Sequence, residues 1–224
     1  DFIRAIGELI IDAGASTLRI VESSMLRTST RNIAAQVGLD IVAKEIGADF
    51  IYLDEHEWVK VKFPKGRTMK TGSIGKPLLD TEKLVIAPCI KTHRLARYTG
   101  AMKLFVGWIK PRDRLLMHAR KLEPKIADLA SYFSPSLIVM DGRRCFVTGG
   151  PASGQTECSN VILASGDMVA IDVEGVRLLQ SYNASNRLTM DVWDVPQIKH
   201  AASLGIGASS DNDIQLVEPE SVIR

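Results

Sequence analysis

The sequence has little cysteine, and its three cysteines are scattered. Cys89, Cys145 and Cys158 lack the C-x-x-C spacing typical of zinc and iron–sulfur sites. The odd number also argues against a disulfide framework, which a chain of 224 residues does not need. We therefore expect a protein of a reducing, cytoplasmic compartment, with no iron–sulfur cluster held within this chain.

The sequence also lacks an excess of charge of one sign and a long hydrophobic run. Its 28 Lys and Arg residues against 26 Asp and Glu residues give a formal net charge of +2. No strong field would attract nucleic acid or a membrane surface. The apolar runs fall well short of the roughly 18 residues that cross a bilayer, and no basic-then-apolar leader opens the chain. We expect a soluble protein whose partners are neither nucleic acid nor a membrane.

What is present is enough apolar sequence for a core, because hydrophobic residues make up 46% of the chain. Helical spacing covers residues 2–11, 30–46 with a break near Gly38, 97–110, 112–133, a segment that Asp167 caps and that runs to about 180, and a segment after Pro196. Strand patterns lie between them, at 17–21, 50–53, 58–63, 84–88, 137–140, 160–164 and 214–217.

This alternation predicts one α/β domain over residues 1–224, with helices on both faces of a mostly parallel or mixed sheet. The chain opens directly on a helical pattern that precedes a strand pattern. We therefore interpret it as truncated at its N-terminus, with a preceding strand missing.

Ligands of α/β sheets bind beyond the carboxyl ends of strands, so the residues that follow strand patterns are the candidate site residues. Lys91 and His93 follow the strand pattern at 84–88 and lie two residues apart, on one side of an extended segment. A cation beside the imidazole favours neutral His93, which is usable as a general base. A solvated loop is the alternative.

Thr99 and Gly100 precede a helical pattern that contains Lys103. A glycine at a helix entry brings backbone N–H groups close to an anion, and Lys103 lies one turn further on. An anion site at this point and an ordinary surface lysine are both open.

Four further features belong to the same hypothesis. Asp141 ends a strand pattern, and Gly149 and Gly150 open a glycine-rich loop to Gly154 that could close over an anion. Asp172 is a carboxylate in an apolar helix, either partnered and structural or turned into the site. His118 follows three apolar residues, where a core or surface histidine is the alternative to a ligand. The patterns place His56 and His200 at the surface.

These motifs occur in a specific order and together resemble the domain of unknown function 362 family over nearly the whole chain. The matching segments are Lys91–His93, Thr99–Lys103 with Gly107, His118, Asp141-Gly142, Gly149–Gly154 and Ser165–Asp172. The chain departs from the family in having Leu104 where Asn is usual. Some members carry ferredoxin-type cysteine motifs, absent here, so the resemblance implies an association with iron–sulfur proteins.

A second, more distant resemblance connects residues 75–118 with the substrate domain of nickel-pincer lactate racemases. It implies an acid/base role for His93, a pincer-nucleotide contact for Lys103 and nickel ligation by His118. The other acid/base histidine of that family would fall in the loop after Val21, which holds Glu22, Ser23 and Ser24 instead.

Together these observations predict an isomerase-like or oxidoreductase-like enzyme acting on a small anionic molecule. The expected catalytic residues are His93 and Lys103, and His118 is the expected ligand of a divalent metal, nickel by analogy. The expected substrate-binding residues are Lys91, Thr99, Gly100, Asp141, Gly149, Gly150 and Asp172. The alternative is a non-catalytic accessory or electron-transfer partner of a ferredoxin-type protein.

Overall fold

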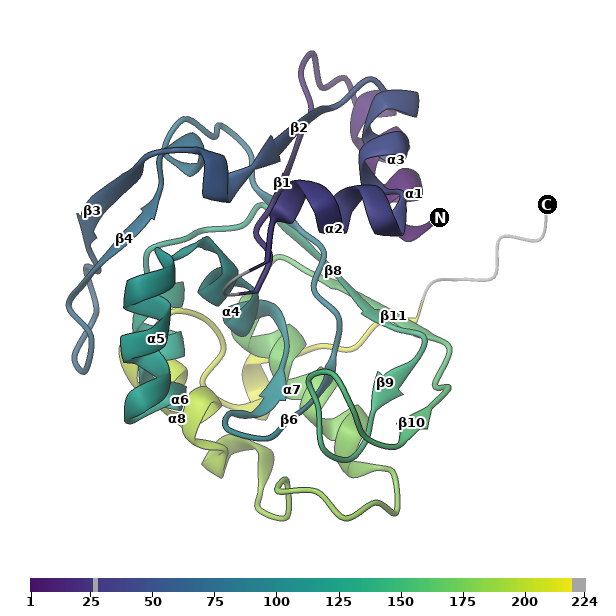
Figure 1. Ribbon diagram of the computed structural model, residues 1–224. Coiled ribbons are helices and arrows are strands. Elements are labelled where there is room, and N and C mark those ends of the chain that lie inside the picture. Colours follow the sequence, from purple (N-terminus) through teal and green to yellow (C-terminus); the bar gives the residue numbers. More distant parts are fainter. Residues whose placement is uncertain (26–27, 219–224) are drawn as a thin grey trace.

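The computed structural model in Figure 1 describes residues 1–25 and 28–218. The first elements are α1 (Phe2–Asp12), β1 (Arg19–Glu22), α2 (Thr30–Val37), α3 (Leu39–Glu45) and β2 (Asp49–Tyr52). Strands β1 and β2 pair in parallel, and the three helices lie beside them in Figure 1. The predicted break near Gly38 is confirmed: this residue has a φ of 71°, a left-handed conformation that ends α2 and suits glycine.

An antiparallel hairpin of β3 (Trp58–Lys62) and β4 (Thr71–Gly75) follows. The sequence did not predict β4, because its two glycines are typical of irregular structure. Gly72 is tightly packed: a Cβ atom here would lie 2.8 Å from side-chain atoms of both Phe63 and Ile109, which would have to shift. The hairpin's loop is held by the buried carboxylate of Asp128, which accepts hydrogen bonds from the backbone of Arg67, Thr68 and Met69.

The largest sheet has the strand order β11–β8–β5, built from β5 (Val85–Ile86), β8 (Leu137–Gly142) and β11 (Val161–Ser165). Strand β5 runs parallel to β8, whereas β11 is antiparallel to it. Helix α7 (Met168–Gln180) packs against β11 and β8, and the Asp167 side chain accepts hydrogen bonds from Val169 and Ala170, as the predicted cap. The α/β class with a mixed sheet is confirmed, and the other strands form two-stranded sheets, including β9 (Cys145–Phe146) with β10 (Thr156–Glu157).

The prediction of a helix over residues 97–110 is wrong at its start. Residues Lys91–His93 form β6 and Arg97–Thr99 form β7, an antiparallel pair that precedes α4 (Ala101–Leu104) and a 3-10 turn (Phe105–Trp108). The helical spacing of apolar residues reflects burial of Tyr98 and the residues after it rather than a continuous helix. Backbone pairing with β6 overrides the local preference.

Two further predictions need correction. The helix over 112–133 is divided into α5 (Pro111–Ala119) and α6 (Leu122–Ala130), because Lys121 adopts a positive φ of 50°. Helix α8 (Pro196–Leu204) forms as expected, but residues 214–217 form no strand. Ile214 packs against the core, whereas Leu216 and Val217 are exposed, so the apolar residues of this segment do not share one buried face.

A buried aromatic cluster anchors the segment after α4. The rings of Phe105 and Phe133 are stacked with centroids 4.5 Å apart, and Trp108 meets both rings at 5.2 Å, edge to face. Because Phe105 and Trp108 belong to the turn that follows α4, this packing fixes the helix against α6.

Candidate functional site

The β6–β7 hairpin brings three of the predicted residues to one face. Lys91 pairs directly with Thr99, and His93 pairs with Arg97. Directly paired residues of antiparallel strands project to the same side, as do residues two apart along one strand. Lys91, His93 and Thr99 therefore share a face, whereas the intervening Thr92 points away and donates to the backbone oxygen of Phe146.

Asp172 positions α4, which carries Lys103. This fully buried carboxylate accepts hydrogen bonds from the backbone N–H groups of Ala101 and Met102 and from the Tyr98 hydroxyl. Burial raises its pKa to about 7, and the hydrogen bonds oppose that rise. Asp172 is thus hydrogen-bonded and structural, the first of the two roles that the sequence left open. It holds the start of α4 and does not make the substrate contact that we expected.

Gly100 is required for that arrangement. A Cβ atom at this position would collide with the carboxylate of Asp172. The expected role of Gly100 was close approach to an anion, but the close approach that the structure shows is to this buried carboxylate.

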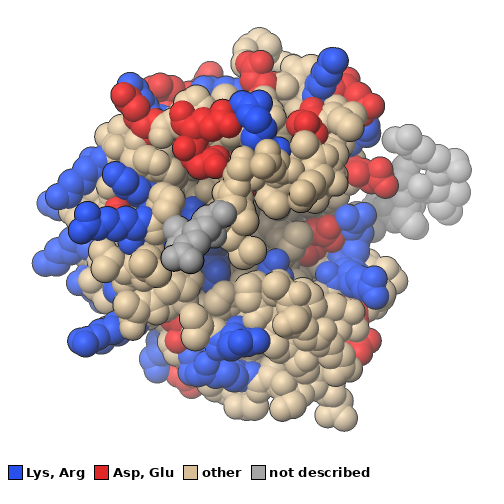
Figure 2. Space-filling model, viewed as in Figure 1, with Lys and Arg blue, Asp and Glu red and all other residues tan. Residues whose placement is uncertain are grey.

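The charged groups of β6, α4 and α5 gather around His93. The imidazole is buried, and its pKa is lowered to about 3 by burial and then by the charges of Lys103, His118 and Lys91. Burial lowers the pKa of Lys103 to about 8, aided by the charges of Lys91 and Arg114. Figure 2 shows blue Lys and Arg atoms recessed in a hollow near the middle of the molecule, over the region where Figure 1 draws α4.

The cations of this cluster have no acidic partner in the described part of the chain. Lys91, Lys103 and Arg114 are half-buried, and none forms an ion pair with Asp or Glu among residues 1–25 and 28–218. Within the same residues, the buried Oγ1 of Thr99 and the Nε of Arg114 have no hydrogen-bond partner. Because buried cations and buried polar atoms are costly without partners, the cluster is suited to an anion.

The hydrogen bonds of the two histidines assign complementary tautomers. Nδ1 of His93 accepts from the backbone N–H groups of Leu95, at 3.1 Å, and Ala96, at 3.0 Å. Its proton therefore lies on Nε2, which is a donor. Nδ1 of His118 lies 2.7 Å from the backbone oxygen of Arg114, which can only accept, so in the neutral ring Nε2 keeps its lone pair.

Arg114 is a site residue that the sequence patterns did not indicate. Its guanidinium donates to the backbone oxygen of Ser24, at 2.8 Å, to the Ser23 hydroxyl, at 3.0 Å, and to the backbone oxygen of Gly107. It lies four residues before His118 in α5, so both side chains share one helix face. That spacing is the signal that could have found it.

Asp141 and Cys89 lie at the neighbouring strand end, where their backbones form a parallel bridge. The Arg143 guanidinium binds the Asp141 carboxylate with two hydrogen bonds and lowers its pKa. Burial raises the pKa of the Cys89 thiol, and the charge of Asp141 adds to the rise. Asp141 is therefore occupied by an arginine of its own loop, which leaves it less able to bind a ligand.

The glycine-rich loop that begins at Gly149 supports β6 from its edge. Gly150 has a φ of 67°, its backbone oxygen accepts from the N–H of Arg94, and a Cβ atom at this position would collide with the backbone of Thr92. The loop thus holds the strand that carries Lys91 and His93 through backbone contacts, and its glycines permit that approach.

The described side chains do not form a site that could hold a metal ion with protein ligands alone. Within residues 1–25 and 28–218 there is no group of three or more His, Cys, Asp and Glu side chains arranged to hold a metal. The charged side chains that act on His93 together with His118 are the cations Lys91 and Lys103, and cations repel a divalent metal. The expected role of His118 as a nickel ligand therefore gains no support from its surroundings.

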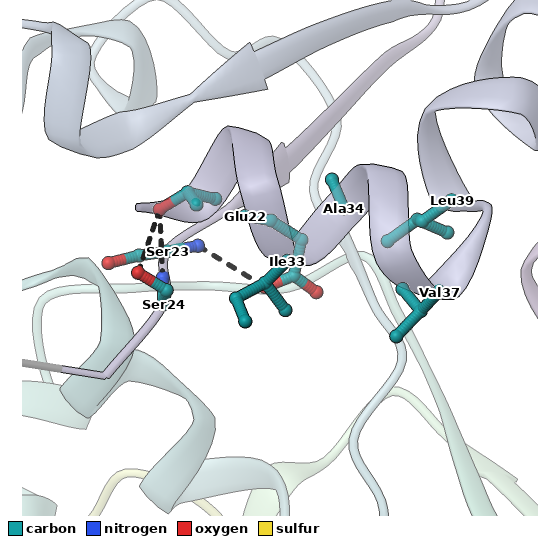
Figure 3. Close-up of a pocket in the computed structure, with 8 residues that line it drawn as sticks. Glu22, Ser23, Ser24, Ile33, Ala34, Val37 and Leu39 are labelled. Carbon is teal, nitrogen blue, oxygen red and sulfur yellow. Dashed lines mark hydrogen bonds between the residues drawn. The ribbon is translucent and has the colours of Figure 1, made fainter. Parts of the chain in front are cut away.

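A pocket of about 210 Å³ opens at the carboxyl end of β1 (Figure 3). One part of its wall is polar, and the other is the apolar side of α2 and the start of α3. The lining residues are Glu22, Ser23, Ser24, Thr30, Ile33, Ala34, Val37 and Leu39. A second pocket, of about 340 Å³, lies at the start of α7 and shares no residue with the cationic cluster.

His200 requires a correction, since the sequence placed it at the surface. It is half-buried, and its Nε2 lies 2.8 Å from the Asp128 carboxylate, so it helps join α8 to α6. The His200–Asp128 pair therefore stabilises the packing of two helices and does not belong to the cationic cluster.

Comparison with known proteins places these residues in a family. No curated protein and no solved structure matches the chain. In the described ranges 1–25 and 28–218, every helix is too short or too polar to cross a membrane. A family model described as "Domain of unknown function (DUF362)" matches residues 1–177, which include the whole cationic cluster and Asp172. The chain therefore belongs to the DUF362 family, as its motifs predicted.

Proposed function

We propose that this protein is an enzyme that binds a small anion through Lys91, Lys103 and Thr99 and moves a proton between the ligand and His118. The observation that carries the proposal is the half-buried cluster of cations without an acidic partner in the described residues. An anion would supply the missing charge, and its oxygens would accept from the two ammonium groups and the free hydroxyl.

The two tautomers divide the chemistry between the histidines. His118 offers the Nε2 lone pair as a proton acceptor, whereas His93 offers an N–H group from a ring that stays neutral. A neutral imidazole that donates can stabilise negative charge developing on a substrate oxygen as the proton leaves. Returning the proton at a different position would complete an isomerase-type reaction.

The anion could be a carboxylate of the substrate or the phosphate of a nucleotide cofactor, because lysines bind both. Titration calorimetry with acetate, lactate, inorganic phosphate and AMP tests this directly. We expect at least one of them to bind, and Lys103→Ala and Lys91→Ala each to weaken that binding by roughly 10-fold to 100-fold, the loss of a charge-assisted hydrogen bond.

The matched control is Lys83→Ala, which removes an exposed lysine and should leave the affinity unchanged. The proposal fails if none of the four anions binds, or if Lys103→Ala and Lys91→Ala both bind as tightly as the wild type. Capture of a ferredoxin-type protein in place of any anion would support the accessory role instead.

A further inference from the structure

Arg114 of the cationic cluster contacts two residues that line the pocket at the end of β1. Ser23 and Ser24 line the pocket, and both accept hydrogen bonds from Arg114. The same guanidinium is close enough for its charge to lower the pKa of Lys103. Arg114 therefore belongs to the cationic cluster and also contacts the polar wall of the pocket.

A second relation between the two regions is electrostatic and runs through Cys89, beside β6. The charges of Lys91 and Glu22 both act on the Cys89 thiol, Lys91 lowering its pKa and Glu22 raising it. Lys91 belongs to the cluster, and Glu22 lines the pocket. Glu22 of the pocket and Lys91 of the cluster therefore both lie within electrostatic range of Cys89.

The far wall of the pocket is apolar and open to solvent. Ile33 and Val37 lie one turn apart in α2 and are 40% and 69% exposed. In Figure 3 both side chains project from the same side of α2, with Ser23 and Ser24 beyond one end of the helix. Large apolar side chains left in the wall of a pocket favour a ligand with an apolar surface.

Glu22 adds a selective element. Its side chain keeps contact with solvent, yet its neighbours surround it closely enough to desolvate the carboxylate and raise its pKa. Figure 3 shows the Glu22 carboxylate beside Ile33. A second anionic group placed here would be repelled by the Glu22 carboxylate, so this end of the site disfavours negative charge.

We infer that this pocket receives the uncharged, apolar part of the same ligand whose anionic group binds Lys91 and Lys103. The inference rests on the proposed function, which supplies the anion site. A pocket of about 210 Å³ is smaller than the roughly 300–1,000 Å³ of sites for drug-sized ligands. The ligand class is therefore a small anion with one charged end and a short apolar body.

Chain-length series test this, with a carboxylate series of acetate, butyrate and hexanoate and a matched series of methyl, butyl and hexyl phosphate. For the wild type we expect the calorimetric affinity in at least one series to rise by roughly threefold for each methylene that enters the pocket. Val37→Ser should abolish most of this rise. The series with the greater affinity identifies the charged group.

Ile41→Ser is the matched control, because Ile41 is 58% exposed on α3 and does not line the pocket. Both serine variants replace exposed side chains, and thermal unfolding checks that both are folded. The inference is overturned if wild-type affinity is independent of chain length, if no member of either series binds, or if Val37→Ser and Ile41→Ser behave alike.

Two further variants separate this inference from the proposed function. Lys103→Ala should weaken acetate and hexanoate by the same factor. If Lys103→Ala leaves both affinities unchanged while the rise with chain length persists, the anion site fails and the apolar pocket stands. Glu22→Gln should improve binding of adipate, which has a second carboxylate, relative to hexanoate; an unchanged ratio would remove Glu22 from the pocket's selectivity.

Discussion

At the scale of single residues, the protonation of Lys103 decides how ligand binding depends on pH. Its pKa of about 8 means that the ammonium loses its proton as the pH rises through 8. We expect the affinity for a bound anion to fall over that range, measured by calorimetry in matched buffers. Lys103→Arg keeps the charge and should remove the fall, unless the amine itself is needed. An affinity that is level across this range in the wild type would contradict the assignment.

The lowered pKa of Lys103 affects the stability of the free protein in the opposite direction from ligand affinity. Between about 8 and the ordinary value of 10.5, the unfolded chain keeps the proton that the folded Lys103 has lost. Because the unfolded state binds more protons in this window, the contribution of Lys103 to the free energy of unfolding increases as the pH rises.

His93 provides a second prediction at this scale, for the state of the imidazole. The pKa of His93 is about 3, and its Nδ1 accepts two hydrogen bonds. In the folded protein, the ring should therefore remain the neutral Nε2–H tautomer at every pH above about 4. Long-range ¹H–¹⁵N NMR spectra distinguish the two ring nitrogens. A His93 signal that titrates near 6.5 would contradict the arrangement.

The low pKa of His93 also predicts acid sensitivity. From about 6.5 down to 3, the unfolded chain takes up a proton at this histidine and the folded chain does not. The folded state therefore loses stability as the pH falls through this window.

At the scale of elements, α4 depends on the close approach of Gly100 to Asp172. Gly100→Ala places a Cβ against the buried carboxylate and should lower the free energy of unfolding by about 1–3 kcal/mol while displacing Lys103. Denaturant unfolding and anion titration measure the two effects. Gly107→Ala is the control, because a Cβ there meets no atom within 4 Å, and similar losses in both variants would contradict this account.

At the scale of the whole molecule, Arg114 connects the N-terminal segment to the helical part of the chain. It joins α5 to the loop after β1 through hydrogen bonds that span 90 and 91 residues. Arg114→Lys keeps the charge but lacks the several donors of a guanidinium, so the loop should loosen. Hydrogen exchange should then be faster in β1 and at Ser23 and Ser24, with α6 unchanged.

The control for this prediction is Arg112→Lys, an exposed residue of the same helix. We expect it to leave exchange in β1 and at Ser23 and Ser24 as in the wild type. Equal exchange in the wild type and in Arg114→Lys would show that the guanidinium does not hold the two parts together.

The sequence by itself determined the features that depend on neighbours along the chain. The alternation of patterns predicted the α/β class, and the cap at Asp167 was found because an aspartate preceding an apolar helix is a local signal. Lys91 and His93 could be placed on one side because residues two apart in a strand always are. The order of the motifs was enough to indicate the DUF362 family.

Only the tertiary structure decided the features that depend on contacts between distant segments. Residues 97–99 became a strand because β6 offered a pairing edge, and that register brought Thr99 opposite Lys91. Asp172 lies 71 residues from the amide of Ala101 that it accepts from, and Arg114 meets Ser23 across 91 residues. No local pattern encodes such partners. The burial that lowers the pKa of Lys103 arises in the same way, because chain segments remote in sequence exclude water from its ammonium group.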